Sequence, residues 1–165
     1  MRVFGIDPGS RTTGWSVVER DRGRYVLVDA GAIRTSPDAD MSARLLRIHT
    51  ELRDLLARHR PDAAAIEQIF AHKSAASALV LGQARGVALV TVAAAGVPLH
   101  EYNASTVKVS VAGSGSADKT AVARMVAALV GRTIDGPADA TDAVAIAITH
   151  HAHAGRAALL ARAAR

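Results

Sequence analysis

Four acidic residues stand at positions where a carboxylate is costly. Asp7 and Glu67 each end a short apolar run, and such runs become buried parallel strands. The two runs are residues 3–6 and 63–66. Asp139 and Asp142 lie three residues apart near the start of a late apolar helix, so they share one helix face. Because buried carboxylates lose hydration and repel one another, these four acids need a positive partner.

A hard divalent cation such as Mg²⁺ suits this set because it takes oxygen ligands. In two-metal phosphodiester hydrolysis, ions about 4 Å apart activate a water molecule and stabilise the leaving oxygen. Asp7, held on a rigid strand between neighbours, is the natural bridging ligand. Glu67 is then a candidate ligand for one ion, and Asp139 with Asp142 for the other. The four acids together therefore predict metal-assisted phosphate chemistry.

Each acid taken alone also has a structural interpretation. Asp7 could cap the turn that follows it, and Glu67 could pair with an arginine such as Arg85. Asp139 could be a favourable negative charge in the first turn of a helix. Asp142 lies deeper in the helix, where that explanation is weaker. The metal hypothesis therefore depends on the combination of the four residues.

The composition is that of one folded domain with a basic excess. Its 165 residues are 50% hydrophobic and 21% charged, which is enough for a real core and excludes wholesale disorder. Lys and Arg number 20 against 15 acids, and a net charge of +5 suits a polyanion such as nucleic acid. Only Lys73, Lys108 and Lys119 are lysines, and all three fall in or beside predicted loops or helix starts. A bias toward arginine explains the same excess equally well.

The sequence favours a reducing compartment. It contains no cysteine, so disulfides and thiolate metal sites are excluded. Residues 1–7 do not have the layout of a signal peptide. The longest uncharged apolar stretch, residues 86–99, is too short to span a bilayer and contains Gly and Pro. We therefore expect a cytoplasmic protein with no membrane association.

Apolar periodicity and turn residues predict an α/β domain with a mixed five-stranded sheet flanked by helices. Strands are expected at residues 2–7, 15–19, 25–33, 63–67 and 98–102. Helices are expected before Pro61, at residues 75–95, after Asn103, from Asp118 or Ser116 to Gly131, and from Pro137 to about His153. Residues 1–155 then form a single domain, and residues 156–165 form a basic tail that we expect to fray. Ligands of such sheets bind at the carboxyl ends of strands, where Asp7 and Glu67 lie.

The predicted helix at residues 75–95 is apolar nearly all round, broken only by Gln83 and Arg85. Such a helix is buried on both sides. In a chain of this size one of those sides can be a subunit interface, and Gly82 and Gly86 would permit close approach. This feature favours a homodimer, with a central core helix of the monomer as the alternative.

Three further features carry weaker signals. Phe70 follows Glu67 by three residues, and a Phe beside a phosphate site could stack on bases or wedge between them, or else anchor the next helix in the core. His150, His151 and His153 are expected to be structural, because they close a helix where the dipole favours cations. The Gly-Ser stretch at residues 113–116 lacks the ending and the preceding strand of a phosphate loop.

Five stretches, collinear over nearly the whole chain, resemble the RuvC family of crossover-junction endodeoxyribonucleases, which have the ribonuclease-H-like fold. They are Gly5-Ile6-Asp7-Pro8-Gly9-Ser10 with Thr13-Gly14; Ala65-Ile66-Glu67-Gln68 with Phe70; Ser77-Ala78-Leu79 with Leu81-Gly82-Gln83-Ala84-Arg85-Gly86; residues 113–119; and Ala138-Asp139-Ala140-Thr141-Asp142-Ala143. The departures are small: Ser74 stands where the family often has Asn, and Trp15 where Tyr is common. The catalytic acids all match.

The resemblance implies a homodimer that binds a four-way (Holliday) DNA junction in recombination and repair and nicks two opposed strands symmetrically. It assigns Asp7, Glu67, Asp139 and Asp142 as a catalytic quartet for two Mg²⁺ ions per site, with Mn²⁺ as a substitute. It implies the branch-migration proteins RuvA and RuvB as partners. It places Phe70 against bases and Lys108 and Lys119 on DNA, and Lys73, Ser74 and Arg85 complete the predicted DNA-binding set.

Two other classes of function are compatible with parts of the sequence. Sugar kinases and actin-like ATPases also place an acid and a Gly-containing turn after a first strand, although they usually need two such domains. A junction-binding module without catalysis is the second alternative, and the intact quartet disfavours it. Cleavage of a synthetic junction separates both alternatives from a nuclease.

Overall fold

The computed structural model describes residues 1–68 and 74–163, and all side chains in those ranges except those of residues 157–159 and 161–163. The strands are β1 (Arg2–Asp7), β2 (Thr12–Asp21), β3 (Arg24–Arg34), β4 (Ala63–Glu67) and β5 (Leu99–Tyr102). The helices are α1 (Met41–His59), α2 (Ala75–Ala94), α3 (Ala104–Ala112), α4 (Lys119–Val130) and α5 (Ala138–Ala163). The predicted order of strands and helices is therefore confirmed.

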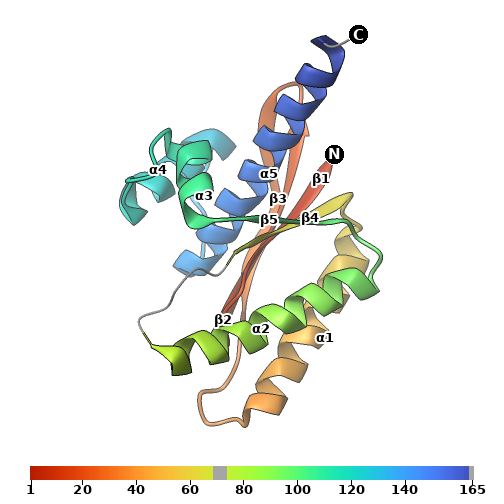
Figure 1. The fold of residues 1–165 in the computed structure, drawn as a ribbon, viewed down its shortest axis with the longest axis vertical. Helices are drawn as coiled ribbons and strands as arrows, with labels where there is room; N and C mark the ends of the chain where they lie inside the picture. The colour runs from red at the N-terminus through yellow and green to blue at the C-terminus, as the bar shows by residue number, and fades with distance from the viewer. Residues whose placement is uncertain (69–73, 164–165) are drawn as a thin grey trace.

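The five strands form one mixed sheet in the order β3-β2-β1-β4-β5. Strand β1 pairs antiparallel with β2 and parallel with β4, and β5 is parallel to β4. Helices α1 and α2 cover one face, and α3, α4 and α5 lie on the other (Figure 1). Because β1, β4 and β5 run in the same direction, their carboxyl ends meet at one edge of the sheet.

Each face of the sheet has its own apolar core. Phe4, Ile6 and Ile66 point toward α1 and α2, where they pack with the buried stripe of α1. That stripe is Ile48, Leu52, Leu55 and Leu56. Val3, Val18 and Ala65 point to the other face and pack with α3, α4 and α5. The alternation along β1 is that of a central strand buried on both faces, as its apolar run predicted.

Local signals set most element ends. Asn103 and Asp118 cap α3 and α4, because their side chains accept hydrogen bonds from the backbone N–H groups of Thr106 and Ala121. The prediction for α4 left Ser116 open, and the structure selects Asp118. Strands β2 and β3 are longer than predicted, because a two-residue turn with positive φ at Arg22 (45°) and Gly23 (85°) lets the hairpin pair along its full length.

Helix α5 continues well past the predicted end near His153 and includes residues 156–163 of the predicted tail, whose fraying stays a prediction. Gly155 lies inside the helix and does not end it. Four of the eight residues 156–163 are alanine, which is the best helix former. The predicted end of this helix near His153 is therefore too early.

Two glycines allow α5 to lie unusually close to the sheet. A Cβ added to Gly5 in β1 would lie 2.1 Å from the carbonyl oxygen of Ala143. A Cβ added to Gly14 in β2 would lie 2.0 Å from the carbonyl oxygen of Asp139. Gly14 is also the cross-strand partner of Asp7. The missing side chains therefore let the first turns of α5, with Asp139 and Asp142, approach the end of β1.

Gly14→Ala is expected to displace the start of α5 and to destabilise the fold by roughly 1–3 kcal/mol, because the new methyl group meets backbone that cannot give way. Gly155→Ala, within α5 itself, is the control, since its Cβ would meet only the end of the Arg20 side chain. It should be neutral or stabilising by about 1 kcal/mol or less. Chemical denaturation of both variants checks this, and equal stability of the two would show that the close approach is not needed.

Candidate metal centre and active site

Asp7 and Glu67 lie side by side at the carboxyl edge of the sheet. In the parallel pair β1–β4, Ile6 is the partner of Ile66, so the next residue on each strand is one of the two acids. The chain after Asp7 is held by Thr13, whose buried hydroxyl donates to the carbonyl oxygen of Gly9 at 2.7 Å. Both predicted strand-end acids are therefore where the sequence placed them, on backbone that is firmly fixed.

The other two acids reach the same edge from α5. Asp139 lies in the first turn of that helix and Asp142 one turn further on. Both are partly exposed, whereas the next residues of α5, Ala143 to Ile148, are buried against the sheet. The seating of α5 on Gly5 and Gly14 thus decides how near these carboxylates come to Asp7.

The four acids form one electrostatic unit. Burial, and then the charges of Asp142, Glu67 and Asp139, raise the pKa of Asp7 to about 8. Burial raises the pKa of Glu67, and Asp142 raises it further. The pKa of Asp142 is also raised, first by burial and in addition by Asp139. A negative charge in excess at this edge is the condition that a divalent cation would relieve.

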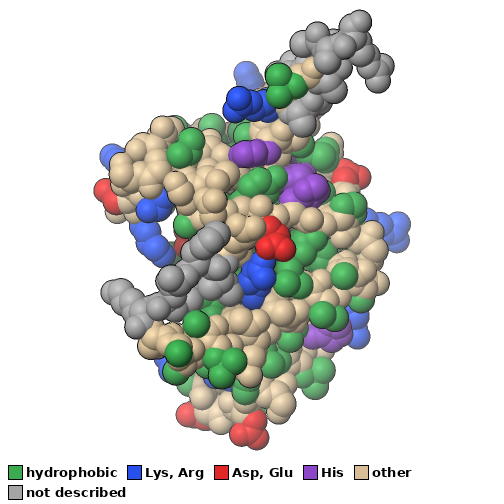
Figure 2. All heavy atoms as spheres, viewed as in Figure 1, with side chains coloured by type: hydrophobic (Ala, Val, Ile, Leu, Met, Phe, Trp, Pro, Cys, Tyr) green, Lys and Arg blue, Asp and Glu red, His purple; other side chains and the backbone are tan. Residues whose placement is uncertain are grey.

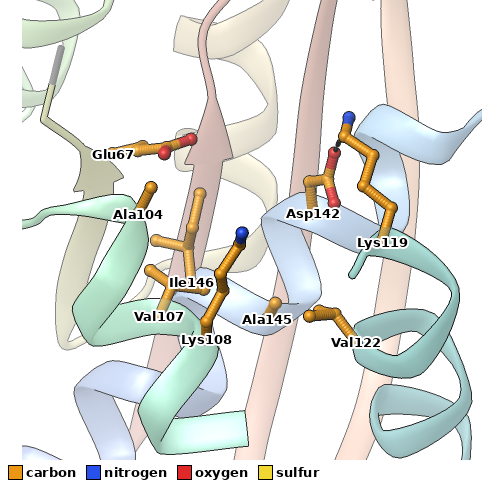
Figure 3. Close-up of a pocket in the computed structure, with 9 residues that line it drawn as sticks. All are labelled: Glu67, Ala104, Val107, Lys108, Lys119, Val122, Asp142, Ala145 and Ile146. Carbon is orange, nitrogen blue, oxygen red and sulfur yellow. Dashed lines mark ion pairs between the residues drawn. The ribbon is translucent and has the colours of Figure 1, made fainter. Parts of the chain in front are cut away.

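A pocket of about 260 Å³ opens between Glu67 and the helices α3, α4 and α5. Figure 3 shows Glu67 extending from β4 toward Asp142 across this space, with Lys108 rising from α3 between them. The floor is apolar, since Val107, Val122 and Ile146 line it. The pocket therefore joins two of the acids to two lysines over a surface that offers no competing ligand.

Two of the predicted DNA-binding residues, Lys108 and Lys119, line this pocket. Lys119 places its Nζ atom 3.5 Å from Oδ2 of Asp142, and it lowers the pKa of Asp7, Glu67 and Asp142. Lys108 is partly buried and lowers the pKa of Glu67. The structure thus places both lysines beside the acids, and their contact with DNA stays a prediction.

The donor set fits a hard cation in kind, because it consists of carboxylate oxygens. Within residues 1–68 and 74–163, however, no three Asp, Glu or His side chains converge closely enough to hold one ion as they stand. The acids lie at the same sheet edge and their charges raise the pKa values of Asp7, Glu67 and Asp142, but they do not surround a single metal position. Such a half-open set is typical of Mg²⁺ sites, which retain water and use substrate phosphate as a ligand.

Arg85 is engaged inside the protein. Its Nε donates to the carbonyl oxygen of Glu67 at 3.2 Å, and its Nη2 pairs with the carboxylate of Glu101. The predicted alternative, an ion pair between Arg85 and the carboxylate of Glu67, is therefore wrong, because the guanidinium reaches across the end of β4 to β5. Arg85 holds the backbone that carries Glu67, and its contact with DNA stays a prediction.

The remaining predicted DNA-binding residues are only partly described. Ser74 caps α2, since its Oγ accepts from the N–H of Ser77 at 3.2 Å, and it is exposed. Its contact with DNA stays a prediction. Phe70 and Lys73 lie outside the described residues.

Two of the three predicted structural histidines, His150 and His151, are structural, but for a different reason than the sequence suggested. They lie in the middle of the helix, away from its end. His150 contacts the hydroxyl of Tyr102 through Nδ1 at 2.9 Å, and the Nε2 of His151 lies 3.0 Å from the carbonyl oxygen of Val18. Burial, followed by the nearby histidines, lowers the pKa of His150 to about 4. These rings therefore fasten α5 to the sheet in their neutral form.

Sequence reasoning placed Gly5, Thr13 and Gly14 in a family motif but did not assign them their role in bringing the acids together. Gly5, Gly14 and Thr13 carry no chemistry of their own, yet they set the approach of α5 and the turn after Asp7. A signal was present, because glycine is unfavourable inside a strand and often marks a close approach of backbone. What approaches could not be known before α5 was placed.

This combination of a five-stranded mixed sheet, acids at its carboxyl edge and an acid-bearing helix laid across it is that of the ribonuclease-H-like fold, as predicted. The family model described as crossover junction endodeoxyribonuclease RuvC matches residues 3–150. A RuvC from Chloroflexus aggregans is 49% identical over 151 residues, which cover 91% of this chain and 92% of the relative. The chain belongs to the RuvC family.

Solved structures agree with this assignment. Thermus thermophilus RuvC in complex with a Holliday junction substrate superposes with a TM-score of 0.87 at 37% identity, covering 93% of this chain and 94% of that one. The yeast mitochondrial Holliday junction resolvase has a TM-score of 0.67 at 11% identity, covering 90% of this chain and 76% of that one, and shares the fold.

The raised pKa of Asp7 predicts how stability depends on pH. Between the ordinary value of 3.8 and about 8, the folded protein binds this proton more tightly than the unfolded chain does. The resulting stability is complete below pH 3.8 and is lost as the pH rises through about 8. Metal-free wild-type protein should therefore lose stability between about pH 5 and pH 9, and Asp7→Asn should lose less.

Thermal unfolding in a chelator across this range measures the difference. Asp54→Asn, an exposed acid on α1, is the control and should follow the wild type. Stabilisation by added Mg²⁺ should grow with pH in the wild type, because ligands must lose their protons to bind metal. A wild type and an Asp7→Asn variant with parallel pH profiles would contradict the predicted coupling.

Proposed function

We propose that this protein is a structure-selective endonuclease that resolves four-way DNA junctions in homologous recombination and repair by nicking two opposed strands symmetrically. The observation that carries the proposal is the gathering of Asp7, Glu67, Asp139 and Asp142 at one sheet edge beside Lys108 and Lys119. The relative of known structure that holds a Holliday junction supports the substrate class. The basic excess of the chain supports a nucleic-acid partner.

In this proposal Asp7, Glu67, Asp139 and Asp142 hold two Mg²⁺ ions, for which Mn²⁺ can substitute. When bound, such a pair supplies activation of water and stabilisation of the leaving oxygen at the scissile phosphodiester. Asp7 is the central acid of this proposal because it ends the central strand β1 and the charges of the other three acids all raise its pKa. Glu67 and Asp142 face the pocket from opposite sides (Figure 3). In this proposal the scissile phosphate binds between them.

In this proposal the lysines compensate the charge of the substrate, and the rigid strand ends keep the acids in position. Lys108 and Lys119 offset the phosphate charge at the pocket mouth. Arg85 and Thr13 keep the backbone beside Glu67 and Asp7 from shifting. Phe70 is proposed to contact bases near the crossover, with Lys73, Ser74 and Arg85 as further DNA contacts. A rigid site of this kind favours a bound geometry close to that of the reaction.

Asp7→Asn should abolish nicking of a synthetic four-way junction in Mg²⁺, with a loss of at least about 100-fold, since even groups that only support metal ligands cost 10–100-fold. Junction affinity should remain or increase, because an acid that repels phosphate has been removed. Gel analysis of nicked strands and a separate binding titration measure the two effects. Equal cleavage by both proteins, or ATP turnover without cleavage, would refute the nuclease assignment.

We propose that the active protein is a homodimer joined through α2. In the described part of the chain, α2 alone is long and apolar enough to cross a membrane by length and composition. Ala84, Ala88 and Val92 pack into the core, so one face is buried as predicted, but Leu79 and Val90 are each 66% exposed. Figure 2 shows hydrophobic side chains along the outer side of this helix. A second copy would cover this face and supply the second active site for the opposed strand.

Val90→Glu should convert the dimer to a monomer, because it places a charge on the exposed apolar face of α2. Light scattering after size-exclusion chromatography measures the mass. Met125→Glu, at an exposed apolar position on α4, is the control and should remain dimeric. A monomeric wild type would contradict the proposal, as would a dimeric Val90→Glu variant.

The proposed setting of this activity is the cytoplasm, with the branch-migration proteins RuvA and RuvB as partners and no membrane association. We propose RuvA and RuvB because the resemblance to the RuvC family implies them. Co-purification of the three proteins on a synthetic junction would test the association.

A further inference from the structure

Lys119 is the cation that the structure joins directly to the acidic quartet. Its Nζ lies 3.5 Å from Oδ2 of Asp142, and within the described ranges this is the one ion pair that any of the four acids makes. Figure 3 shows the side chain running alongside Asp142 at the rim of the pocket. The same charge lowers the pKa of Asp7 and Glu67. One ammonium group therefore offsets part of the repulsion among three acids.

The base of this lysine is fixed while its tip is free to move. Lys119 is the first residue of α4, and Asp118 caps that helix through the N–H of Ala121 at 2.7 Å. Val122 and Val126 anchor α4 in the core. The side chain of Lys119 is nevertheless 87% exposed. A separation of 3.5 Å is also longer than the roughly 2.8 Å of a strong charged hydrogen bond. The ammonium group can therefore leave Asp142 without any change in α4.

A divalent ion and this ammonium group need the same carboxylate. Mg²⁺ binds carboxylate oxygen at about 2.1 Å, and two cations on one exposed carboxylate repel each other. We propose that Lys119 is a resident counter-ion of Asp142, which a divalent metal ion displaces, leaving the ammonium group at the pocket mouth to meet the DNA phosphate. This inference rests on the metal-binding part of the proposed function.

Lys108 provides the contrast that makes the proposal testable. It lines the same pocket from α3 and lowers the pKa of Glu67. No ion pair joins it to an acid among the described residues, however, and it is partly buried. Removing either lysine takes one positive charge from the pocket, but only the loss of Lys119 removes a direct competitor at a ligand oxygen.

The test uses the full-length protein and its variants without DNA. Calorimetric titration with Mg²⁺ measures the affinity for the ion, and thermal unfolding measures the stability. Lys119→Met should bind Mg²⁺ about two- to five-fold more tightly than the wild type, in line with the strength of an exposed ion pair. Lys119→Arg should retain wild-type affinity, and Lys108→Met should gain less than Lys119→Met. In chelator at about pH 8, Lys119→Met should unfold at a lower temperature than the wild type, and saturating Mg²⁺ should remove the difference.

Unchanged or weaker Mg²⁺ binding by Lys119→Met would overturn the counter-ion role, and so would an equal gain in Lys108→Met. Lys119→Gln provides a second neutral variant if the methionine does not fold. Junction nicking by the wild type is measured separately. If the wild type binds Mg²⁺ and shows the lysine effect but does not nick DNA, the nuclease assignment fails and the counter-ion role stands. If the wild type does not bind Mg²⁺, the counter-ion role is overturned with the metal site.

Discussion

Repulsion among the four carboxylates at one edge of the sheet is the constraint on which the surrounding structure depends. Asp7 cannot retreat, because β1 is a central strand held between β2 and β4. Asp139 and Asp142 are brought in by a helix that lies almost against the backbone of β1 and β2. Burial, together with the charges of Asp142, Glu67 and Asp139, raises the pKa of Asp7 to about 8. The rigid backbone thus holds the carboxylates close together, where a divalent cation would relieve their repulsion. Charged groups that are held in place in this way can stabilise a transition state without reorganisation.

The few lysines and the many arginines have different tasks. Lys108 and Lys119 each carry a compact ammonium group on a flexible side chain that lines the pocket. Such a group can change its ionic partner more easily than a planar guanidinium group can. Arg85 is locked by its planar group to Glu101 and to the backbone of Glu67. Arg44 is similar, since its Nη2 donates to the hydroxyl of Ser10 in the turn after β1. Arg85 and Arg44 therefore support the backbone at this edge of the sheet, whereas Lys108 and Lys119 line its pocket.

Helix α2 shows how one element can serve two surfaces. Its inner side completes the core formed by Phe4 and α1, while Leu79 and Val90 face outward. The same helix carries Arg85, which braces the strand end beneath Glu67. A subunit interface on the outer side of α2 would therefore be linked through Arg85 to the strand end that carries Glu67. The geometry of the two sites in a dimer would then depend on the packing of this one helix.

The sequence by itself determined the order of the elements, the strand-end positions of Asp7 and Glu67, the shared face of Asp139 and Asp142, and the family. These features follow from apolar runs, caps and turn residues, which act between near neighbours in the chain. It could not determine that Gly5 and Gly14 meet α5, that Arg85 binds the backbone carbonyl of Glu67 and not its carboxylate, or that His150 and His151 fasten the middle of α5. Those facts concern partners far apart in the chain, up to 133 residues for His151 and Val18, so only tertiary packing decides them. Local physics thus placed each acid on its element, and the close approach of α5 to the sheet made the four acids into one site.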